Sequence, residues 1–380
     1  MSILQMILRE LKQAFLKDPR RATFLFGAAL AYSIIFGILY MPGVVKHVPF
    51  VVYDEEQSVL SRDLTRRFED NENFKIVGYV SSQEELQQAL IDKKAYVALQ
   101  IPADLSKKVK TGSSSNILFH VNGSNIILTN ITSSTAQDII AEFSDTVAAK
   151  NAAMRTSGNE ILLKKKLSPV HSQLRVSNNP TQSYMMFFLL GLACAAYQQG
   201  IFLAVGAAVY SEYEDRKIHK QVGAIRILTV KFATYLLMSI ASWGLILLAM
   251  HAFNLTTKSS LLPLFMLGTA FAFAAIAMSM MFSTLFHRES QYVRASIMYT
   301  VPAFIFGGYT WPIESMGVVT STLAAIFPMA YLSNAVRYLF LSGSLYTLSF
   351  NLSVLCLMGC VFGAVAYYRF PRHIKKNLER

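Results

Sequence analysis

The sequence has few charged side chains, and it carries no motif of the common catalytic chemistries. Only 15% of its 380 residues are Asp, Glu, Lys or Arg, whereas 53% are hydrophobic. An ordinary soluble domain is roughly a quarter charged. The sequence contains no G-x-x-x-x-G-K-[ST], G-x-S-x-G, H-E-x-x-H or C-x-x-C motif. It therefore lacks the patterns of a nucleotide-hydrolysing site, a serine hydrolase, a zinc protease and a thioredoxin-like redox site.

Cysteine and histidine are too few and too scattered to predict a disulfide framework or a metal site. The three cysteines, Cys194, Cys356 and Cys360, all lie in apolar runs. The seven histidines, at positions 47, 120, 171, 219, 251, 287 and 373, form no pair with ligand spacing. We therefore expect no catalytic residues in this chain, no metal and no cofactor of its own.

The apolar residues are concentrated in long runs without Asp, Glu, Lys or Arg. A helix that crosses the hydrocarbon core of a bilayer needs about 20 apolar residues, so each run is a candidate transmembrane helix. The first run is too long for a cleaved secretory signal and follows a basic lead segment, which favours an uncleaved span. The seven candidate runs are Ala22–Val45, Val176–Ser211, Phe232–Thr257, Ser259–His287, Ala295–Ile313, Ser315–Val336 and Tyr338–Tyr368.

The basic residues predict which ends of these helices face the cytoplasm. Lys and Arg are enriched on the cytoplasmic side of membrane proteins. Of the 35 basic residues, 17 lie in the lead segment, in the segments after the second and fourth runs, and in the C-terminal tail. A basic face of this kind also suits nucleic acids, but we favour a topology signal with anionic-lipid contact and expect no nucleic-acid partner.

An even number of spans keeps the basic lead segment and the basic tail on the same side. Ser315–Val336 is the weakest candidate, because Pro328 interrupts it and Gly307, Gly308 and Pro312 precede it. Irregular backbone at membrane depth is tolerated only where protein or water shields it. We therefore predict six transmembrane helices and a broken, re-entrant segment at 311–337 on the outer side, with both termini in the cytoplasm.

The interval between the first two spans reads as a water-exposed α/β domain. It contains 16 basic and 15 acidic residues, and its short β-branched and aromatic runs at 48–53, 74–80, 95–101 and 116–121 predict strands. Helical patterns cover Gln57–Asp70, Ser82–Ile91 and Pro102–Lys110, with Ser82 as the expected N-cap. A longer helix follows from about Ser124 to Lys150. The β-α-β-α-β-α-β order predicts a small α/β domain.

The predicted fold class is thus an α-helical membrane protein with six transmembrane helices plus an inserted α/β extracytoplasmic domain. The expected boundaries are a lead helix at 1–21, the first transmembrane helix at 22–45, the α/β domain at 46–180, five further transmembrane helices at 181–370 and a basic tail at 371–380. The 181–370 region contains a charged cytoplasmic loop at 212–231 and the re-entrant segment.

Two groups of polar residues are candidate functional sites. The cytoplasmic loop offers both signs of charge, which suits docking to a partner protein and also suits a solvated loop beside the membrane. Two glutamines lie inside an apolar run, where an amide must face protein or water. They fit a substrate pathway, and they equally fit hydrogen bonding between helices. The loop residues are Glu212, Glu214, Asp215, Arg216 and Lys217, and the glutamines are Gln198 and Gln199.

Three features together resemble the membrane (permease) subunits of type-2 ABC exporters, in the subgroup with a large extracytoplasmic domain after the first transmembrane helix. The first is the architecture just described. The second is the loop Tyr210-Ser-Glu-Tyr-Glu-Asp-Arg-Lys-Ile-His-Lys-Gln-Val-Gly223, which is similar to the family's coupling segment. The third is Phe306-Gly-Gly-Tyr-Thr-Trp-Pro-Ile-Glu-Ser-Met316 with Ile326-Phe-Pro-Met-Ala-Tyr331, which is similar to its re-entrant outer motif. The residues that match this motif are Trp311, Pro312, Met316, Pro328 and Arg337.

The resemblance implies a transport function in a bacterial plasma (inner) membrane. It implies cytosolic ABC ATPase subunits that bind ATP and magnesium and dock on the 212–231 loop. A second permease copy or a close relative would complete the pathway, and a membrane-fusion protein would extend export across two membranes. The substrate stays open, with a lipophilic or amphipathic molecule as one class.

A membrane receptor or sensor is the main alternative, with the α/β domain binding a ligand or protein outside the cytoplasm. Its weakness is that the expected cytoplasmic parts are short and leave no room for an output domain. An envelope scaffold would need the α/β domain and one span, which leaves five spans unexplained.

Overall fold

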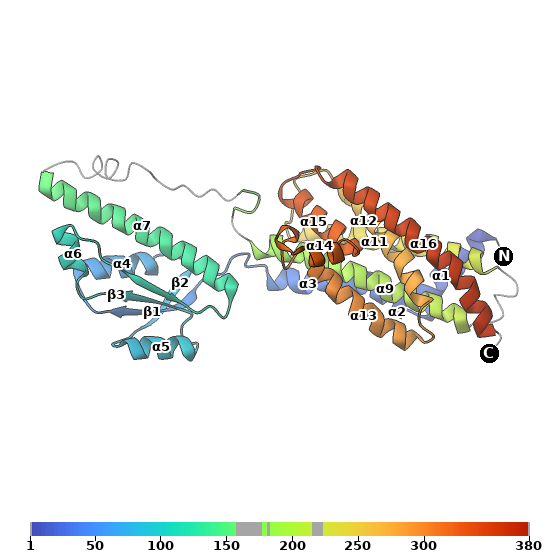
Figure 1. Cartoon of the computed structure of the whole chain (residues 1–380), viewed down its shortest axis with the longest axis horizontal. Helices are drawn as coiled ribbons and strands as arrows, with labels where there is room; N and C mark the ends of the chain where they lie inside the picture. Colours follow the sequence, from blue (N-terminus) through green and yellow to red (C-terminus); the bar gives the residue numbers. More distant parts are fainter. Residues whose placement is uncertain (1, 157–176, 181–182, 215–222, 379–380) are drawn as a thin grey trace. The chain divides into compact units, whose positions relative to one another are not determined.

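The computed structural model describes residues 2–156, 177–180, 183–214 and 223–378 (Figure 1). The chain divides into two compact units. One unit is Met1–Gly43 with Val176–Arg380, and it is helical. The other is Val44–Arg175, and it contains the strands.

The Val44–Arg175 unit is an α/β structure with one four-stranded sheet. Its elements in chain order are β1 (Val48–Asp54), α4 (Val59–Glu69), β2 (Phe74–Tyr79), α5 (Gln83–Ile91), β3 (Val97–Ile101), α6 (Leu105–Thr111), β4 (Leu118–Val121) and α7 (Ile126–Thr156). The strand order is β2-β1-β3-β4, with β1 parallel to β2 and β3, and β4 antiparallel to β3. Strand β2 pairs Ile76 with Phe50 but Gly78 with Val51, so Val77 has no partner in β1.

Helices cover both faces of this sheet. Figure 1 shows α5 on one face and α4, α6 and α7 on the other. The α4 side buries an aromatic cluster in which the Phe50 and Phe68 rings lie 5.4 Å apart, with Phe74 and Phe119 beside them. The α5 side buries a smaller core around Val51, Leu86 and Ala98. The alternating strand pattern thus supplies side chains to two cores.

The helical unit begins with helix α1 (Ile3–Lys12), which continues into a π-helical turn, η1 (Gln13–Lys17). The first long apolar helix runs from Arg20 to Leu39. It is built from α2 (Arg20–Ala22), a π-helical segment η2 (Thr23–Ala28) and α3 (Ala29–Leu39). The Ser242 hydroxyl donates a hydrogen bond of 2.6 Å to the Leu25 carbonyl within η2. This bond satisfies a carbonyl in the irregular segment, as an apolar surrounding requires.

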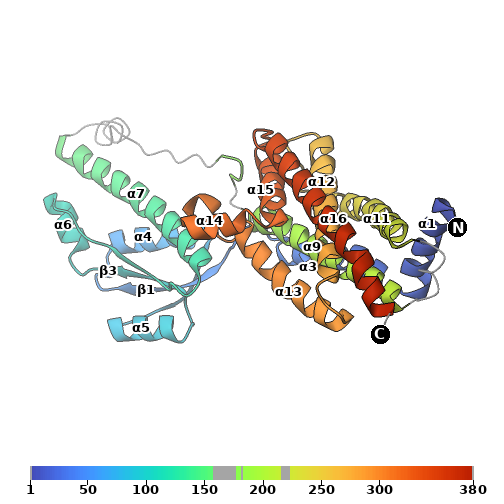
Figure 2. The ribbon, with the colours of Figure 1, turned by 45° about the vertical axis from the view of Figure 1, so that its right-hand side comes forward.

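The remaining helices complete the unit. They are η3 (Met185–Leu189), α9 (Leu190–Glu214), α11 (Ala224–Ala252), α12 (Leu261–Ser283), α13 (Glu289–Phe306), the short η4 (Ile313–Ser315), α14 (Val318–Ala324), α15 (Pro328–Leu341) and α16 (Leu348–Leu378). Helices α12 and α16 lie side by side (Figure 2). Helix α1 and the C-terminal end of α16 lie at the same end of this unit (Figures 1 and 2).

Five helices in the described part of the chain are long and apolar enough to cross a membrane. They are Arg20–Leu39, Met185–Tyr213, Ala224–Ala252, Leu261–Ser283 and Leu348–Ile374. Helices α14 and α15 pass the same test as a pair, but an 89° bend separates them, so they form a broken span or a re-entrant loop. The protein is therefore a membrane protein of the helical class, with a bent helix pair in the region where the sequence predicts a re-entrant segment.

Two predicted spans contain a break in the structure. The run Ala295–Ile313 is helical only to Phe306, and its helix α13 begins at Glu289 and is not among the five. The run Tyr338–Tyr368 was predicted as one span, but its first residues end α15 and the last helix starts at Leu348. Gly343 makes this break, because its φ of 72° belongs to the left-handed region and a Cβ would lie 3.0 Å from the Lys258 carbonyl oxygen.

Candidate functional site

The lead segment forms an amphipathic helix that packs on the bundle through one face. Ser2 and Gln5 form a capping box that fixes the start of α1. Met6, Glu10 and Ala14 are buried at a spacing of four residues, which places them on one face of the helix. Several large apolar side chains of the lead segment are nevertheless exposed, namely Ile3, Leu4, Leu8, Phe15 and Leu16. Such a helix suits the surface of a bilayer.

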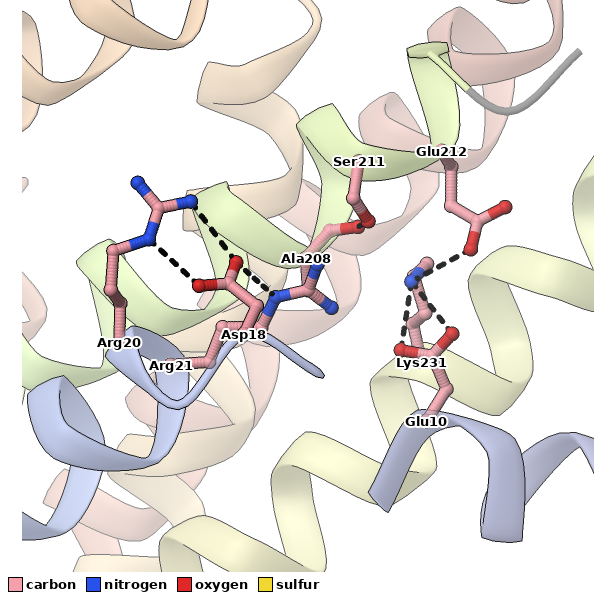
Figure 3. Close-up of polar contacts among 8 residues, drawn as sticks. All are labelled: Glu10, Asp18, Arg20, Arg21, Ala208, Ser211, Glu212 and Lys231. Atoms are coloured by element: carbon pink, nitrogen blue, oxygen red, sulfur yellow. Dashed lines mark hydrogen bonds and ion pairs between the residues drawn. The ribbon is translucent and has the colours of Figure 1, made fainter. Parts of the chain in front are cut away.

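A buried ion cluster joins this helix to α9 and α11 (Figure 3). Lys231 Nζ lies 2.8 Å from both carboxylate oxygens of Glu10 and 3.2 Å from Glu212 Oε1. Arg9 Nη2 donates to Glu212 Oε1 at 3.2 Å. The side chains of Lys231, Glu10 and Glu212 are at most 4% exposed. These four residues, Arg9, Glu10, Glu212 and Lys231, are called the ion cluster below.

The charges of the ion cluster cancel, which explains why the fold tolerates them in a buried place. A buried charge is costly unless an opposite charge and hydrogen bonds compensate for the lost water. Two carboxylates face one ammonium and one guanidinium, and Glu10 uses both of its oxygens on Lys231. The cluster therefore fixes the position of three segments that are far apart in the sequence.

A second group of charges lies where the lead segment enters the first long helix. Asp18 accepts hydrogen bonds from Arg20 Nε at 2.7 Å and from Arg21 Nε at 3.1 Å (Figure 3). The hydrogen bond from Arg20 lowers the pKa of the Asp18 carboxyl below its ordinary value. Asp18 therefore stays ionised and holds the turn between η1 and α2.

The structure places only part of the predicted 212–231 loop. Glu212 and Glu214 belong to the last turn of α9, and Lys231 lies within α11. Asp215, Arg216 and Lys217 lie outside the described residues. Glu212 was expected to offer its charge at the surface, but its side chain is fully buried in the ion cluster. A role of Glu212 in docking a partner stays a prediction.

The two glutamines lie where α9 faces α13. Gln199 accepts a hydrogen bond from the Thr300 hydroxyl of α13, and Gln198 is buried. Gln198 Oε1 and Gln199 Nε2 have no hydrogen-bond partner within the described residues. Gln199 thus makes a bond between helices, as one of the two interpretations expects. A pathway role for either residue stays a prediction.

The predicted outer motif surrounds the bent helix pair. Pro312 precedes η4, Met316 follows it, and Pro328 is the first residue of α15. Trp311 is exposed and donates its indole N–H to the Ser315 carbonyl. Pro fits the first position of a helix because its missing N–H is not needed there.

Arg337 is held by aromatic rings in the same region. Its guanidinium lies 5.1 Å from the centre of the Tyr309 ring and 5.4 Å from that of Phe187, and it donates to Asn334 Oδ1 at 2.7 Å. These contacts join α15 to η3 and to the turn after α13. Gly308 makes that turn possible, because its φ of 77° is left-handed and a Cβ would lie 2.5 Å from Asn334 Nδ2.

Within the described ranges, no group of three or more His, Cys, Asp or Glu side chains is arranged to hold a metal ion. In the α/β unit, the crevice at the carboxyl ends of β1 and β3 is the usual ligand position of such sheets. Here the Glu56 carboxylate accepts from the backbone N–H and hydroxyl of Ser106 and from the Ser58 hydroxyl. These hydrogen-bond donors are therefore already paired with the Glu56 side chain.

Sequence reasoning missed the ion cluster as a unit. It counted Arg9 and Lys231 as topology charges and assigned Glu10 no role. A signal was present, because Glu10 lies between Met6 and Ala14 at a spacing of four residues, which places a carboxylate on the same helix face as two apolar side chains. Its partner could not be identified, since Lys231 lies 221 positions away in the sequence.

Residues 22–368 match the model of a protein family described as ABC-2 family transporter protein. Over 376 residues the chain is 22% identical to the probable multidrug ABC transporter permease YbhR of Escherichia coli K12, covering 97% of this chain and 98% of that protein. It is also 21% identical to ABC transporter G family member 20 of Dictyostelium discoideum over 173 residues, which are 44% of this chain and 24% of that protein.

Proposed function

Since the chain belongs to the ABC-2 family of transporter proteins, we propose that it is the permease subunit of an ATP-driven exporter. The observation that carries this proposal is the family match over residues 22–368. The match covers all five long apolar helices, apart from Arg20 and Arg21 at the start of the first helix and residues 369–374 at the end of the last. A protein built in this way moves a solute across a membrane and leaves hydrolysis to another subunit.

The energy source we propose is a cytosolic ABC ATPase that binds ATP and magnesium. The sequence has no nucleotide-binding motif, so hydrolysis needs a partner. The docking site we propose is the segment around Glu214, Asp215, Arg216 and Lys217, which connects α9 to α11. Mixed charges of this kind steer and orient a protein partner.

The proposed assembly contains two permease chains, either identical or closely related, with two ATPase subunits. Gln198 and Gln199 are the polar residues we assign to the pathway, since two of their amide atoms are unpaired in the described structure. The relative named as a probable multidrug permease favours a lipophilic or amphipathic substrate. A membrane-fusion protein outside the membrane is a further proposed partner.

We place the protein in a bacterial inner membrane with both termini in the cytoplasm. The basic residues of the lead segment, the α9–α11 connection and the tail support this orientation. The common location of α1 and the end of α16 supports an even number of crossings. In this proposal α13 is the fifth crossing, α16 is the sixth, and α14 with α15 is re-entrant on the outer side.

The proposal is tested by reversing the charges of the docking segment. The variant E214K/R216E should insert and fold normally, because both substitutions exchange one charged residue for another outside the apolar runs. It should lose most ATPase in co-purification and most ATP-driven uptake of ethidium into inverted vesicles, since desolvated docking charges are worth a few kcal/mol.

The matched control is R66D/D70R, which reverses an exposed ion pair on α4. This control should leave both ATPase binding and ethidium uptake at the wild-type level. If wild-type protein binds no ABC ATPase at all, the exporter function is wrong. If E214K/R216E binds and transports normally, only the docking segment is wrong, and α1 becomes the next candidate.

A further inference from the structure

We propose that Lys231 is a positioning residue that makes the lead helix α1 move as one body with the C-terminal end of α9 and the N-terminal part of α11. Through it, movement that an ATPase imposes on the α9–α11 connection reaches α1. The proposal rests on the proposed function, because it names the device that transmits the partner's movement. It concerns the permease's own helices, so part of it is measurable without transport.

Lys231 joins the two helices that flank the α9–α11 connection. Glu212 lies two residues before the end of α9, and Lys231 lies near the start of α11. The distance of 3.2 Å between Lys231 Nζ and Glu212 Oε1 therefore ties the two helix ends together. A force applied to the connection acts on both helices at once rather than spreading them apart.

The same ammonium group holds α1. Both oxygens of Glu10 lie 2.8 Å from Lys231 Nζ, and no side chain on either side of the contact is more than 4% exposed. One turn away, Met6 packs with Ile227 and Val230 of α11 in a separate apolar cluster. Sliding α1 along α11 would separate buried charges with no water to replace the partner, so the two helices move together.

A purely structural role is the competing interpretation, and it predicts a different result. A buried ion pair that only contributes to folding can be replaced by neutral groups of similar volume without loss. The double variant E10Q/K231M makes this replacement and leaves Glu212 with Arg9, which still donates to it. No uncompensated charge is created, so the variant should fold and bind the ATPase.

The direct test measures whether α1 stays fixed to α11. Spin labels go on Leu8 of α1 and Leu237 of α11, both well exposed, in a background with the substitutions C194A, C356S and C360S. In the wild-type complex the distance distribution should be narrow and the same without nucleotide and after trapping with ATP and vanadate. In E10Q/K231M the distribution should broaden or shift when nucleotide is added.

The second readout is ethidium transported per ATP hydrolysed, which should fall in E10Q/K231M because movement at the α9–α11 connection no longer reaches α1. The variant K231R, which keeps the charge, should recover most of this ratio. A narrow, nucleotide-independent distribution together with a normal ratio in E10Q/K231M would overturn the positioning role.

Two further outcomes are also decisive. If E10Q/K231M cannot be purified, the single variant E10Q replaces it, because Lys231 then still pairs with Glu212. A broadened distance distribution in E10Q supports the proposal, and an unchanged distribution overturns it. If no ABC ATPase binds the wild type, the exporter function fails by a separate measurement, and the positioning role fails with it because no nucleotide-driven movement exists to transmit.

Discussion

Gly206 of α9 lies directly against the buried ring of Tyr292, and this contact predicts a sensitive position. A Cβ at residue 206 would lie 2.0 Å from Tyr292 Cε1. The ring cannot retreat easily, because its hydroxyl contacts the Phe202 carbonyl oxygen and the Ser279 hydroxyl, both at 2.7 Å. We expect G206A to lower the free energy of unfolding by about 1–3 kcal/mol, the usual cost of overpacking. Thermal unfolding in detergent measures this change.

Gly244 of α11 is the matched control. Its nearest neighbour is the Phe265 ring at 3.7 Å, an ordinary contact distance for an added Cβ. Because alanine favours a helix more than glycine does, G244A should leave the unfolding midpoint unchanged or raise it slightly. Equal losses in both variants would show that the Tyr292 contact is not the cause.

At the residue scale, local signals in the sequence were informative and long-range partners were not. Ser82 was predicted as an N-cap, and its hydroxyl accepts from the Glu85 N–H at the start of α5. This prediction needed only four neighbouring residues. Lys231 is different, because its function depends on two carboxylates contributed by other helices. No periodicity in the sequence of α11 indicates which distant residue faces it.

Glu56 links two helices of the α/β unit, and its removal predicts a loss at the scale of an element. Its carboxylate accepts three hydrogen bonds, from the Ser106 N–H, the Ser106 hydroxyl and the Ser58 hydroxyl. These groups belong to the starts of α4 and α6, whose orphan N–H groups favour an anion. We expect E56A to destabilise this unit by about 1–3 kcal/mol. Limited proteolysis of the full-length protein, scored by cleavage within residues 44–156, measures the effect.

The neighbouring substitution E55A is the control for this prediction. Glu55 accepts one exposed hydrogen bond, from Gln100 Nε2 at 2.8 Å, so its loss should change the cleavage rate little. A cleavage rate for E56A no higher than for E55A would contradict the proposed link between α4 and α6.

At the scale of elements, the sequence predicted most helices and strands but not where the membrane helices break. All four predicted strands overlap β1 to β4, because alternating burial on a sheet leaves a clear pattern. Apolar composition marks a helix without marking its ends. The run from Tyr338 therefore hid the turn at Gly343, and the run from Ala295 hid the end of α13 at Phe306. The number of membrane crossings and their orientation rest on the distribution of basic residues and stay a proposal.

For the whole molecule, the charge distribution predicts that the α/β unit faces away from the cytoplasm. Single cysteines at Ser81 and Ser113, both exposed, should react with a membrane-impermeant thiol reagent in intact cells. The background is the cysteine-free protein, and a cysteine at exposed Lys12 of α1 is the control that should react only after lysis. Labelling of residues 81 and 113 only after lysis would invert the topology and contradict export.

The bent pair of α14 and α15 makes a separate prediction about the C-terminus. If the pair is re-entrant, α16 ends in the cytoplasm, as the basic tail also favours. A reporter fused after the last residue should therefore be active in the cytoplasm. Activity of an extracytoplasmic reporter at the same position would mean that the bent pair crosses the membrane.

The unpaired Val77 in strand β2 bears on solubility. Strand β2 is one edge of the sheet, and a regular edge strand offers its free backbone groups to any neighbouring chain. The shifted register at Val77 interrupts this row, the exposed Lys75 adds a charge to it, and the other edge, β4, is only four residues long. Neighbouring copies of this unit are therefore protected from joining edge to edge into a continuous, aggregating sheet.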